Sequence, residues 1–346
     1  MAERILEVEG LSVAIPVPAG TLHPVEDVSF HVERGETVAI VGESGCGKSL
    51  TSLAIMDLLP SKARRTATKL ELDGRDLTGL SEREMSDIRG NRMSMIFQEP
   101  MTSLNPAYTI GDQLTEALLR HRDASRAEAR ERAVWLLEKV GITGASGRLR
   151  QYPHQLSGGL RQRVMIAMAL MCGPDLIIAD EPTTALDVTI QAQILHLLAE
   201  LQREFQTGLI LITHDLGVVS RVADRIAVMY AAQFVEEGTA RQIFEAPSHP
   251  YTQGLLACIP IPGKTARGAH LGSIPGIVPS LIGHIEGCHF ADRCRHAMDK
   301  CRADDIAMRR GAEPGHRYRC VLTPEETAAN MARQEREQRQ EREAAQ

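Results

Sequence analysis

The stretch Gly42-Glu43-Ser44-Gly45-Cys46-Gly47-Lys48-Ser49 decides the fold of this chain. It follows the β-rich run Glu36–Val41 and precedes a segment of helical character from about Lys48 to Leu59. A glycine-rich loop between a strand and a helix directs backbone N–H groups, and the positive end of the helix dipole, at phosphate oxygens. We therefore expect this loop to bind the phosphates of a nucleotide, rather than to be a glycine-rich turn without a ligand.

Each residue type in this loop has an expected contact. The glycines allow the tight turns, Lys48 would bind the β- and γ-phosphate oxygens, and the Ser49 hydroxyl would ligate Mg²⁺. The predicted nucleotide-binding residues of the loop are Gly42, Ser44, Gly45, Cys46, Gly47, Lys48, Ser49 and Leu50.

Two acidic residues supply the other half of the expected site. The apolar run Leu176–Ala179 ends in Asp180 and Glu181. Ligands of α/β sheets bind at the carboxyl ends of the parallel strands. We expect Asp180 to face the Mg²⁺ ion and Glu181 to polarise the attacking water. Two acids after a strand are, on their own, more typical of a solvated turn, and the phosphate loop favours the site.

The order of the expected elements favours an α/β fold with a parallel sheet. The apolar runs Leu176–Ala179 and Leu209–Thr213 flank a helical segment, which is typical of parallel strands joined by a right-handed crossover. Ile5–Val13 and Val25–Val32 alternate between apolar and polar residues and predict an antiparallel subdomain. Helical periodicity prevails between about residues 98 and 174.

Composition limits the classes of function. The net charge of −6 gives no electrostatic reason to expect a nucleic-acid partner. The longest run of Ala, Val, Ile, Leu and Met is eight residues, Val164–Met171, whereas a spanning helix needs about 20. No apolar signal-peptide region follows Met1, so a cytoplasmic location is expected.

Further motifs resemble those of ABC ATPases. Leu156-Ser157-Gly158-Gly159-Leu160-Arg161-Gln162 resembles the signature motif of that family. Gln98 resembles its Q-loop glutamine, Ala185-Leu186-Asp187 its D-loop, and His214 its switch histidine. The resemblance covers about residues 1–240 and implies ATP hydrolysis at an interface between two subunits.

The resemblance assigns roles to these residues. The signature motif of one subunit would contact the γ-phosphate of the ATP held by its partner. The implied catalytic residues are Glu181, His214 and Gln98; the implied Mg²⁺ ligands are Ser49, Gln98 and Asp180; and the implied nucleotide contacts outside the loop are Asp180, Ser157, Gly158, Gly159 and Asp187.

The chain departs from the family pattern at one place. Such ATPases usually carry an aromatic residue in the first β region, which stacks on adenine. This chain has Val13, Ala14 and Ile15 there, and none of them can supply a π-face.

Transport is the favoured role among ABC proteins. The chain has a single motor unit, no long heptad insertion and a negative net charge, which disfavours a role on nucleic acid or ribosomes. Met101–Pro106 and the string from His249 to Leu256, followed by Ile259-Pro260, resemble the ATPases of dipeptide and oligopeptide importers. Importers of nickel or glutathione-like solutes are related alternatives.

That resemblance also implies partners and a location. The expected partners are two transmembrane permease subunits, a second and related ABC ATPase, and indirectly a periplasmic or extracellular solute-binding protein. The expected location is the cytoplasmic face of the inner membrane, where the chain would be peripheral.

Four cysteines cluster near the C-terminus: Cys288, Cys294, Cys301 and Cys320. Their spacers lack the short Cys-x₂₋₄-Cys loop of most structural zinc sites. The family resemblance implies a [4Fe–4S] cluster held by four thiolates. A zinc site, in which His289, His296 or His316 could substitute as ligands, and unligated or disulfide-bonded cysteines remain as alternatives.

The expected organisation has three parts. Residues 1–245 form the ATPase domain, with a helical subdomain at about 98–174. Residues 246–320 form a loop-rich extension with the four cysteines, and residues 321–346 a charged tail that is either a solvated helix or disordered.

Overall fold

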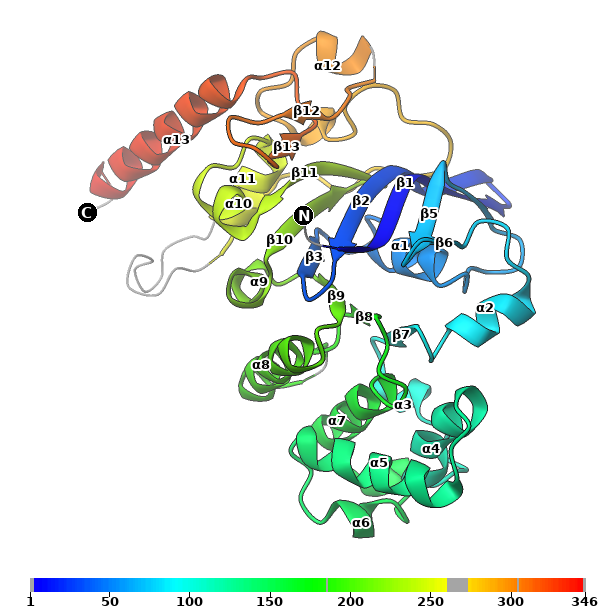
Figure 1. Ribbon diagram of the computed structural model, residues 1–346. Coiled ribbons are helices and arrows are strands. Elements are labelled where there is room, and N and C mark those ends of the chain that lie inside the picture. Colours follow the sequence, from blue (N-terminus) through cyan, green and yellow to red (C-terminus); the bar gives the residue numbers. More distant parts are fainter. Residues whose placement is uncertain (1–2, 185, 260–272, 304, 345–346) are drawn as a thin grey trace.

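The computed structural model describes residues 3–184, 186–259, 273–303 and 305–344. Within these residues the main sheet has eight strands (Figure 1). In spatial order they are β12 (Arg309–Arg310), β13 (Arg317–Tyr318), β11 (Gln233–Thr239), β10 (Arg225–Tyr230), β3 (Thr37–Val41), β9 (Gly208–Thr213), β8 (Leu176–Asp180) and β7 (Met93–Ile96). The strands from β10 to β7 are parallel, which confirms the expected α/β fold.

A second, antiparallel sheet lies against the first. Its members are β1 (Arg4–Val17), β2 (Gly20–Glu33), β4 (Arg64–Thr66), β5 (Lys69–Leu72) and β6 (Arg75–Asp76). The expected strand pair near the N-terminus is therefore present and longer than the alternation suggested.

Both faces of the parallel strands are buried, which explains their continuous apolar runs. Ile178 and Ile210 share a core with the antiparallel sheet. Their neighbours Ile177, Leu209 and Leu211 share another core with the helices on the opposite face.

The helices of the expected helical subdomain gather at one end of the molecule (Figure 1). They are α3 (Pro100–Ser103), α4 (Ile110–His121), α5 (Arg126–Lys139), α6 (Ala145–Arg148), the 3₁₀ helix η1 (Pro153–Gln155) and α7 (Gly158–Ala169). Thr109, Ser125 and Ser157 cap α4, α5 and α7, since each side-chain oxygen accepts a backbone N–H of the first turn.

The remaining helices lie along the sheets and the extension. They are α1 (Lys48–Ile55), α2 (Glu82–Ile88), α8 (Val188–Phe205), α9 (Leu216–Val222), α10 (Ala240–Glu245), α11 (Pro250–Ala257), η2 (Ala291–Arg293), α12 (Lys300–Ala303) and α13 (Pro324–Ala344). Helix α1 ends at Ile55 and not at Leu59, because Asp57 adopts a left-handed backbone with φ 54°.

The C-terminal extension is built onto the main sheet. Strand β13 pairs with β11, with Glu236 opposite Tyr318. Tyr251, Leu281 and Phe290 share a hydrophobic core with Val41 of β3. The extension expected from residue 246 onward is therefore packed against the ATPase core, although the three-part division remains a prediction. Pro260 of the importer-like string lies outside the described residues, and the charged tail is helical in α13.

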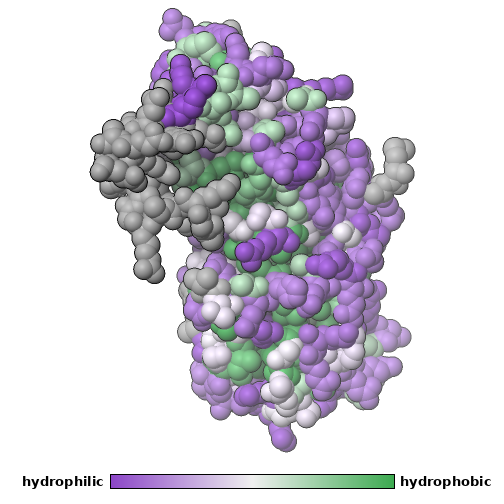
Figure 2. Space-filling model, turned by 90° about the vertical axis from the view of Figure 1, so that its left-hand side faces the viewer, coloured by the Kyte–Doolittle hydropathy of each residue, from purple (hydrophilic) through white to green (hydrophobic). Residues whose placement is uncertain are grey.

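Figure 2 shows one face of the molecule, on which hydrophilic residues surround smaller hydrophobic patches. Across the described residues, no helix combines the length and the apolar character needed to cross a membrane.

Candidate functional site

The phosphate loop lies between the end of β3 and the start of α1. Gly42 has φ 155° and Gly47 has φ 107°. A Cβ atom on Gly42 would lie 2.1 Å from the carbonyl oxygen of Met229, and one on Gly47 would lie 1.9 Å from that of Pro24. The loop is thus packed so closely against β10 and β2 that only glycine fits at these two positions.

Lys48 is folded back over the loop. Its ammonium Nζ donates hydrogen bonds to the carbonyl oxygens of Gly42 and Glu43, both at 2.9 Å, and the residue is buried. The two carbonyl groups hold the ammonium inside the loop, where phosphate oxygens would meet it.

Ser49 and Asp180 form the expected pair of magnesium ligands. Ser49 Oγ donates a hydrogen bond of 2.9 Å to Oδ1 of Asp180. Burial raises the pKa of Asp180, the Ser49 hydrogen bond opposes this, and the neighbouring charge of Glu181 raises it further. A buried carboxylate beside a second one gains from a bound cation, and hydroxyl and carboxylate oxygens are ligands that Mg²⁺ prefers. The residues present therefore fit a magnesium ion.

The other predicted catalytic residues, Gln98 and His214, contact the carboxylate of Glu181. Its Oε2 accepts hydrogen bonds from Gln98 Nε2 at 3.2 Å and from Thr184 Oγ1 at 2.7 Å, and His214 Nδ1 lies 3.4 Å from its Oε1. Its φ of 45° is unusual for a residue with a side chain, and its N–H donates to Ile212 O. Thr184 was not expected here, and the only sequence signal is its place three residues after Glu181.

The signature motif lies apart from this cluster. Ser157 and Gly158 are exposed at the start of α7, and exposed Asp187 caps α8 through the N–H groups of Thr189 and Ile190. The two motifs adjoin, because a Cβ on Gly159 would lie 3.2 Å from Ile190. Among the hydrogen bonds and ion pairs of the described residues, none joins Ser157, Gly158, Gly159 or Asp187 to the loop Gly42–Ser49. Ala185 of the D-loop string lies outside the described residues.

The first β region offers little for adenine. Val13 is buried in the core between the two sheets, and Ile15 packs against the same core. The backbone of Ser12–Ala14 pairs with β4.

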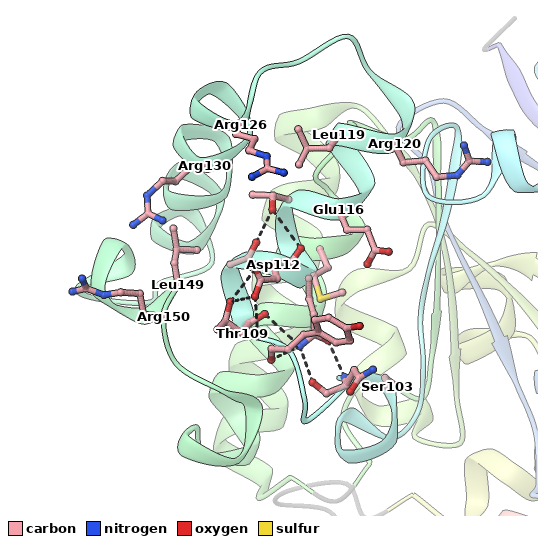
Figure 3. Close-up of a pocket in the computed structure, with 16 residues that line it drawn as sticks. Ser103, Thr109, Asp112, Glu116, Leu119, Arg120, Arg126, Arg130, Leu149 and Arg150 are labelled. Atoms are coloured by element: carbon pink, nitrogen blue, oxygen red, sulfur yellow. Dashed lines mark hydrogen bonds between the residues drawn. The ribbon is translucent and has the colours of Figure 1, made fainter.

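A groove of about 1110 Å³ opens beside the helical end (Figure 3). Ser103, Tyr108 and residues of α4 and α5 line it, including Asp112, Glu116, Arg120, Arg126 and Arg130. Ser103 also lines a smaller pocket together with Gln98 and Asp180. Ser103 therefore borders both the groove and a pocket that two of the predicted site residues line.

The four C-terminal cysteines line one narrow cavity. All four are free thiols, and burial raises the pKa of Cys288 to about 12 and that of Cys320 to about 11. Among the described His, Cys, Asp and Glu residues, no three are grouped closely enough to hold a single metal ion. The four thiols thus share one cavity.

The nearby histidines have other partners or places. His316 Nε2 lies 2.8 Å from Glu236 Oε1, and His289 Nδ1 lies 2.6 Å from Ala231 O, whereas His296 lines the cysteine cavity. His249, which the sequence analysis did not place here, lines it too. Burial lowers the pKa of His249 to about 3, and its buried Nε2 has no hydrogen-bond partner in the described part of the chain. The side chains that line this cavity thus include four thiols and two imidazoles.

Comparison with known families agrees with this geometry. Residues 25–184 match the family described as ABC transporter, and residues 235–301 match the oligopeptide/dipeptide transporter C-terminal region.

Relatives match over most of the chain. The dipeptide transport ATP-binding protein DppD of Bacillus subtilis (strain 168) is 54% identical over 300 residues, which cover 86% of this chain and 89% of that protein. The DppD protein of Escherichia coli (strain K12) is 50% identical over 316 residues, which cover 91% and 96%. The oligopeptide transport ATP-binding protein AppD of Bacillus subtilis (strain 168) is 52% identical over 315 residues, covering 90% and 93%.

A solved structure supports the fold. The dimeric post-hydrolysis state of the ATP-binding cassette MJ0796, bound to ADP and Pi, is similar with a TM-score of 0.60 and 28% identity, covering 68% of this chain and 99% of that one. The chain therefore belongs to the ATP-binding proteins of ABC transporters, in the group that carries the oligopeptide/dipeptide transporter C-terminal region.

Proposed function

We propose that this chain, an ABC ATPase, uses the binding and hydrolysis of ATP to drive the import of di- and oligopeptides across the cytoplasmic membrane. The observation that carries the catalytic part is the convergence of Gln98, His214 and Thr184 on Glu181, next to the Ser49–Asp180 pair. The peptide substrate is inferred from the relatives, whose names specify dipeptide and oligopeptide transport.

The roles of the residues follow from where they lie. Lys48 and the loop N–H groups bind the phosphates, and Ser49, Asp180 and Gln98 hold Mg²⁺, which would neutralise the phosphate charge. Glu181 orients and polarises the attacking water, while His214 and Gln98 fix its carboxylate. Because phosphoryl transfer depends mainly on positioning and charge stabilisation, these residues would supply one half of the site, and the signature motif of a second subunit would supply the other half.

A second ATPase subunit completes the site. Ser157, Gly158 and Asp187 are exposed and have no described contact with the loop of their own chain, so they are free to face the nucleotide of a partner. The dimeric form of the similar MJ0796 cassette supports this arrangement. We infer a related, non-identical ATPase as the partner, as the importer resemblance implies.

The permease is the proposed occupant of the groove in Figure 3. The loop that follows Gln98 is fastened to α4, because Gln113 accepts the Asn105 N–H at 2.8 Å and donates to Asn105 O at 3.0 Å. A cytoplasmic segment of a permease subunit in this groove would therefore sense movement of Gln98 through Ser103. The proposed location is the cytoplasmic face of the membrane, with two permease subunits as the proposed direct partners and a solute-binding protein as the proposed indirect one.

A [4Fe–4S] cluster is the proposed occupant of the cysteine cavity, held by Cys288, Cys294, Cys301 and Cys320. The support is the set of four thiols that line one cavity, together with His249, whose imidazole could hydrogen-bond to sulfur. The cluster would cross-link a loop-rich region that has no long apolar run.

Reconstitution of the native complex into vesicles tests the function. Uptake of a labelled dipeptide that requires ATP and stops in Glu181→Gln supports the proposal. Uptake of Ni²⁺ or glutathione with no uptake of any peptide would overturn the substrate class, and ATPase activity unaffected by permease subunits would overturn the motor role.

A further inference from the structure

The phosphate loop is held from outside by the C-terminal extension. The Arg293 side chain is 5% exposed, and its two terminal nitrogens donate to both carboxylate oxygens of Glu43, from Nη1 to Oε2 at 2.6 Å and from Nη2 to Oε1 at 3.0 Å. A bidentate pair fixes orientation as well as distance. Glu43 is the second residue of the loop, and its carbonyl oxygen accepts the hydrogen bond from Lys48.

The extension sets the position of Arg293. Its Nε donates to Pro275 O at 2.8 Å, and its Nη2 donates to Ile274 O at 3.2 Å. These two carbonyl groups belong to the extension and orient the guanidinium plane. The Arg293 guanidinium is therefore held in one orientation where it pairs with Glu43.

A second contact from the extension reaches the same loop residue. The Glu43 N–H donates to the phenol oxygen of Tyr251 at 2.9 Å. Tyr251 is fully buried, and its ring packs against Tyr230 and Phe290 with centroids 4.6 Å and 5.3 Å away. Both the side chain and the backbone of Glu43 are thus held by residues beyond the ATPase core.

The far side of the loop has a related support. Ala232 donates its N–H to Cys46 O at 2.9 Å, and His289 Nδ1 lies 2.6 Å from Ala231 O. Ala231 and Ala232 both have positive φ, of 40° and 76°, so this turn depends on its neighbours to keep its shape.

The supports are next to the cysteines in the chain. Arg293 precedes Cys294, and His289 follows Cys288. We propose that Arg293 is a positioning residue for the phosphate loop, and that the four-cysteine region controls nucleotide affinity through the Arg293–Glu43 pair. This inference deepens the proposed function and rests on nucleotide binding by the loop.

The charge of Glu43 is the reason why its pairing with Arg293 should affect nucleotide binding. Without Arg293, the Glu43 carboxylate would stand unpaired beside a bound polyphosphate and repel it. The loop would also lose the contact that orients Glu43 O toward Lys48. Affinity should therefore fall more in Arg293→Met than in Glu43→Gln, which removes the arginine's partner and the repelling charge together.

The test is a titration of the full-length protein with MgATP carrying a fluorescent label. Arg293→Met should weaken binding on the order of 10-fold, within the range usual for coupling between sites. Arg293→Met/Glu43→Gln should bind more tightly than Arg293→Met. The matched control is Arg302→Met, which also neighbours a cysteine but pairs with exposed Asp292, and its affinity should not change. Arg293→Lys, which keeps the charge and loses the bidentate geometry, should be intermediate.

A second experiment tests the cysteine region by introducing Cys294→Ser into the wild-type chain and into the Arg293→Met variant. This change should weaken binding in the wild-type chain and add nothing in Arg293→Met, because the two changes act along one route. Equal weakening in both backgrounds, or wild-type affinity in Arg293→Met, would overturn the inference. If the wild-type chain itself binds no MgATP, the proposed function fails; if it binds and Arg293→Met matches it, only this inference fails.

Discussion

Ser49 and Asp180 come from opposite halves of the ATPase core, and their side chains meet in a hydrogen bond of 2.9 Å. Ser49 lies in the first turn of α1, and Asp180 ends the strand β8. Both are therefore held by rigid elements, and Glu181 follows directly in the chain.

Replacement of Glu181 tests the hydrolytic centre. Glu181→Gln should preserve the binding of ATP and slow its hydrolysis by about 100-fold or more, about 2.7 kcal/mol of barrier, because the amide cannot polarise water as a carboxylate does. Steady-state phosphate release by the assembled complex measures this. Near-wild-type turnover would remove Glu181 from the role of base.

Lys48→Ala should weaken nucleotide binding itself. A charge-assisted hydrogen bond is worth about 1.5–3 kcal/mol, which corresponds to a loss of affinity of roughly 10- to 100-fold. Titration with labelled ATP gives the value, and Lys139→Ala is a control because Lys139 pairs with Glu204 on the surface. Unchanged affinity in Lys48→Ala would mean that the loop binds through its backbone alone.

Ser157→Arg tests the two-subunit site. The change should abolish hydrolysis in the complex and leave ATP binding to the mutated chain intact. Ser157 is exposed, and no described hydrogen bond joins it to the phosphate loop of its own chain. Paired measurements of affinity and turnover separate the two effects. Full activity at dilutions where only the monomer exists would contradict the prediction.

Asp180→Asn should raise the thermal stability of the nucleotide-free protein at pH 7, by on the order of 2 °C. Burial raises the folded-state pKa of Asp180 above its ordinary value of 3.8, so the charged form destabilises the fold. This cost is absent below the unfolded pKa and complete above the folded one.

The stabilisation by Asn should therefore shrink as the pH falls toward 4, and the variant should lose the further stabilisation that MgATP gives the wild type. Thermal unfolding at several pH values measures both effects. An Asn variant that is less stable than the wild type at pH 7, without ligand, would contradict the role of burial.

Anaerobic purification tests the cysteine site. The protein should contain about four irons and four labile sulfides per chain and absorb broadly in the visible range. The Cys294→Ser protein should lose the iron. The control Cys172→Ser should retain it, because Cys172 does not line the cavity. One zinc and no iron in the wild type would leave only a structural metal site.

The sequence alone determined the fold class and the chemistry of the nucleotide site. The phosphate loop, the acidic strand end and the signature motif are local strings whose spacing reflects backbone geometry, so Lys48, Asp180 and Ser157 could be read directly. Helix α8 lies between the two apolar runs, as the pattern predicted, whereas α1 ends early because a single left-handed residue, Asp57, stops it. A propensity pattern does not encode such a local backbone state.

Only the tertiary structure showed that residues of the extension contact the phosphate loop. The contact of Arg293 with Glu43 joins residues 250 positions apart in the chain, and that of Tyr251 with the same residue joins residues 208 positions apart. No periodicity or motif couples such distant positions. They meet because β13 pairs with β11 and because Tyr251 and Phe290 pack into the core beside β3. Long-range packing of this kind depends on the whole chain, and for that reason the sequence predicted the loop-rich extension but not its contacts with the phosphate loop.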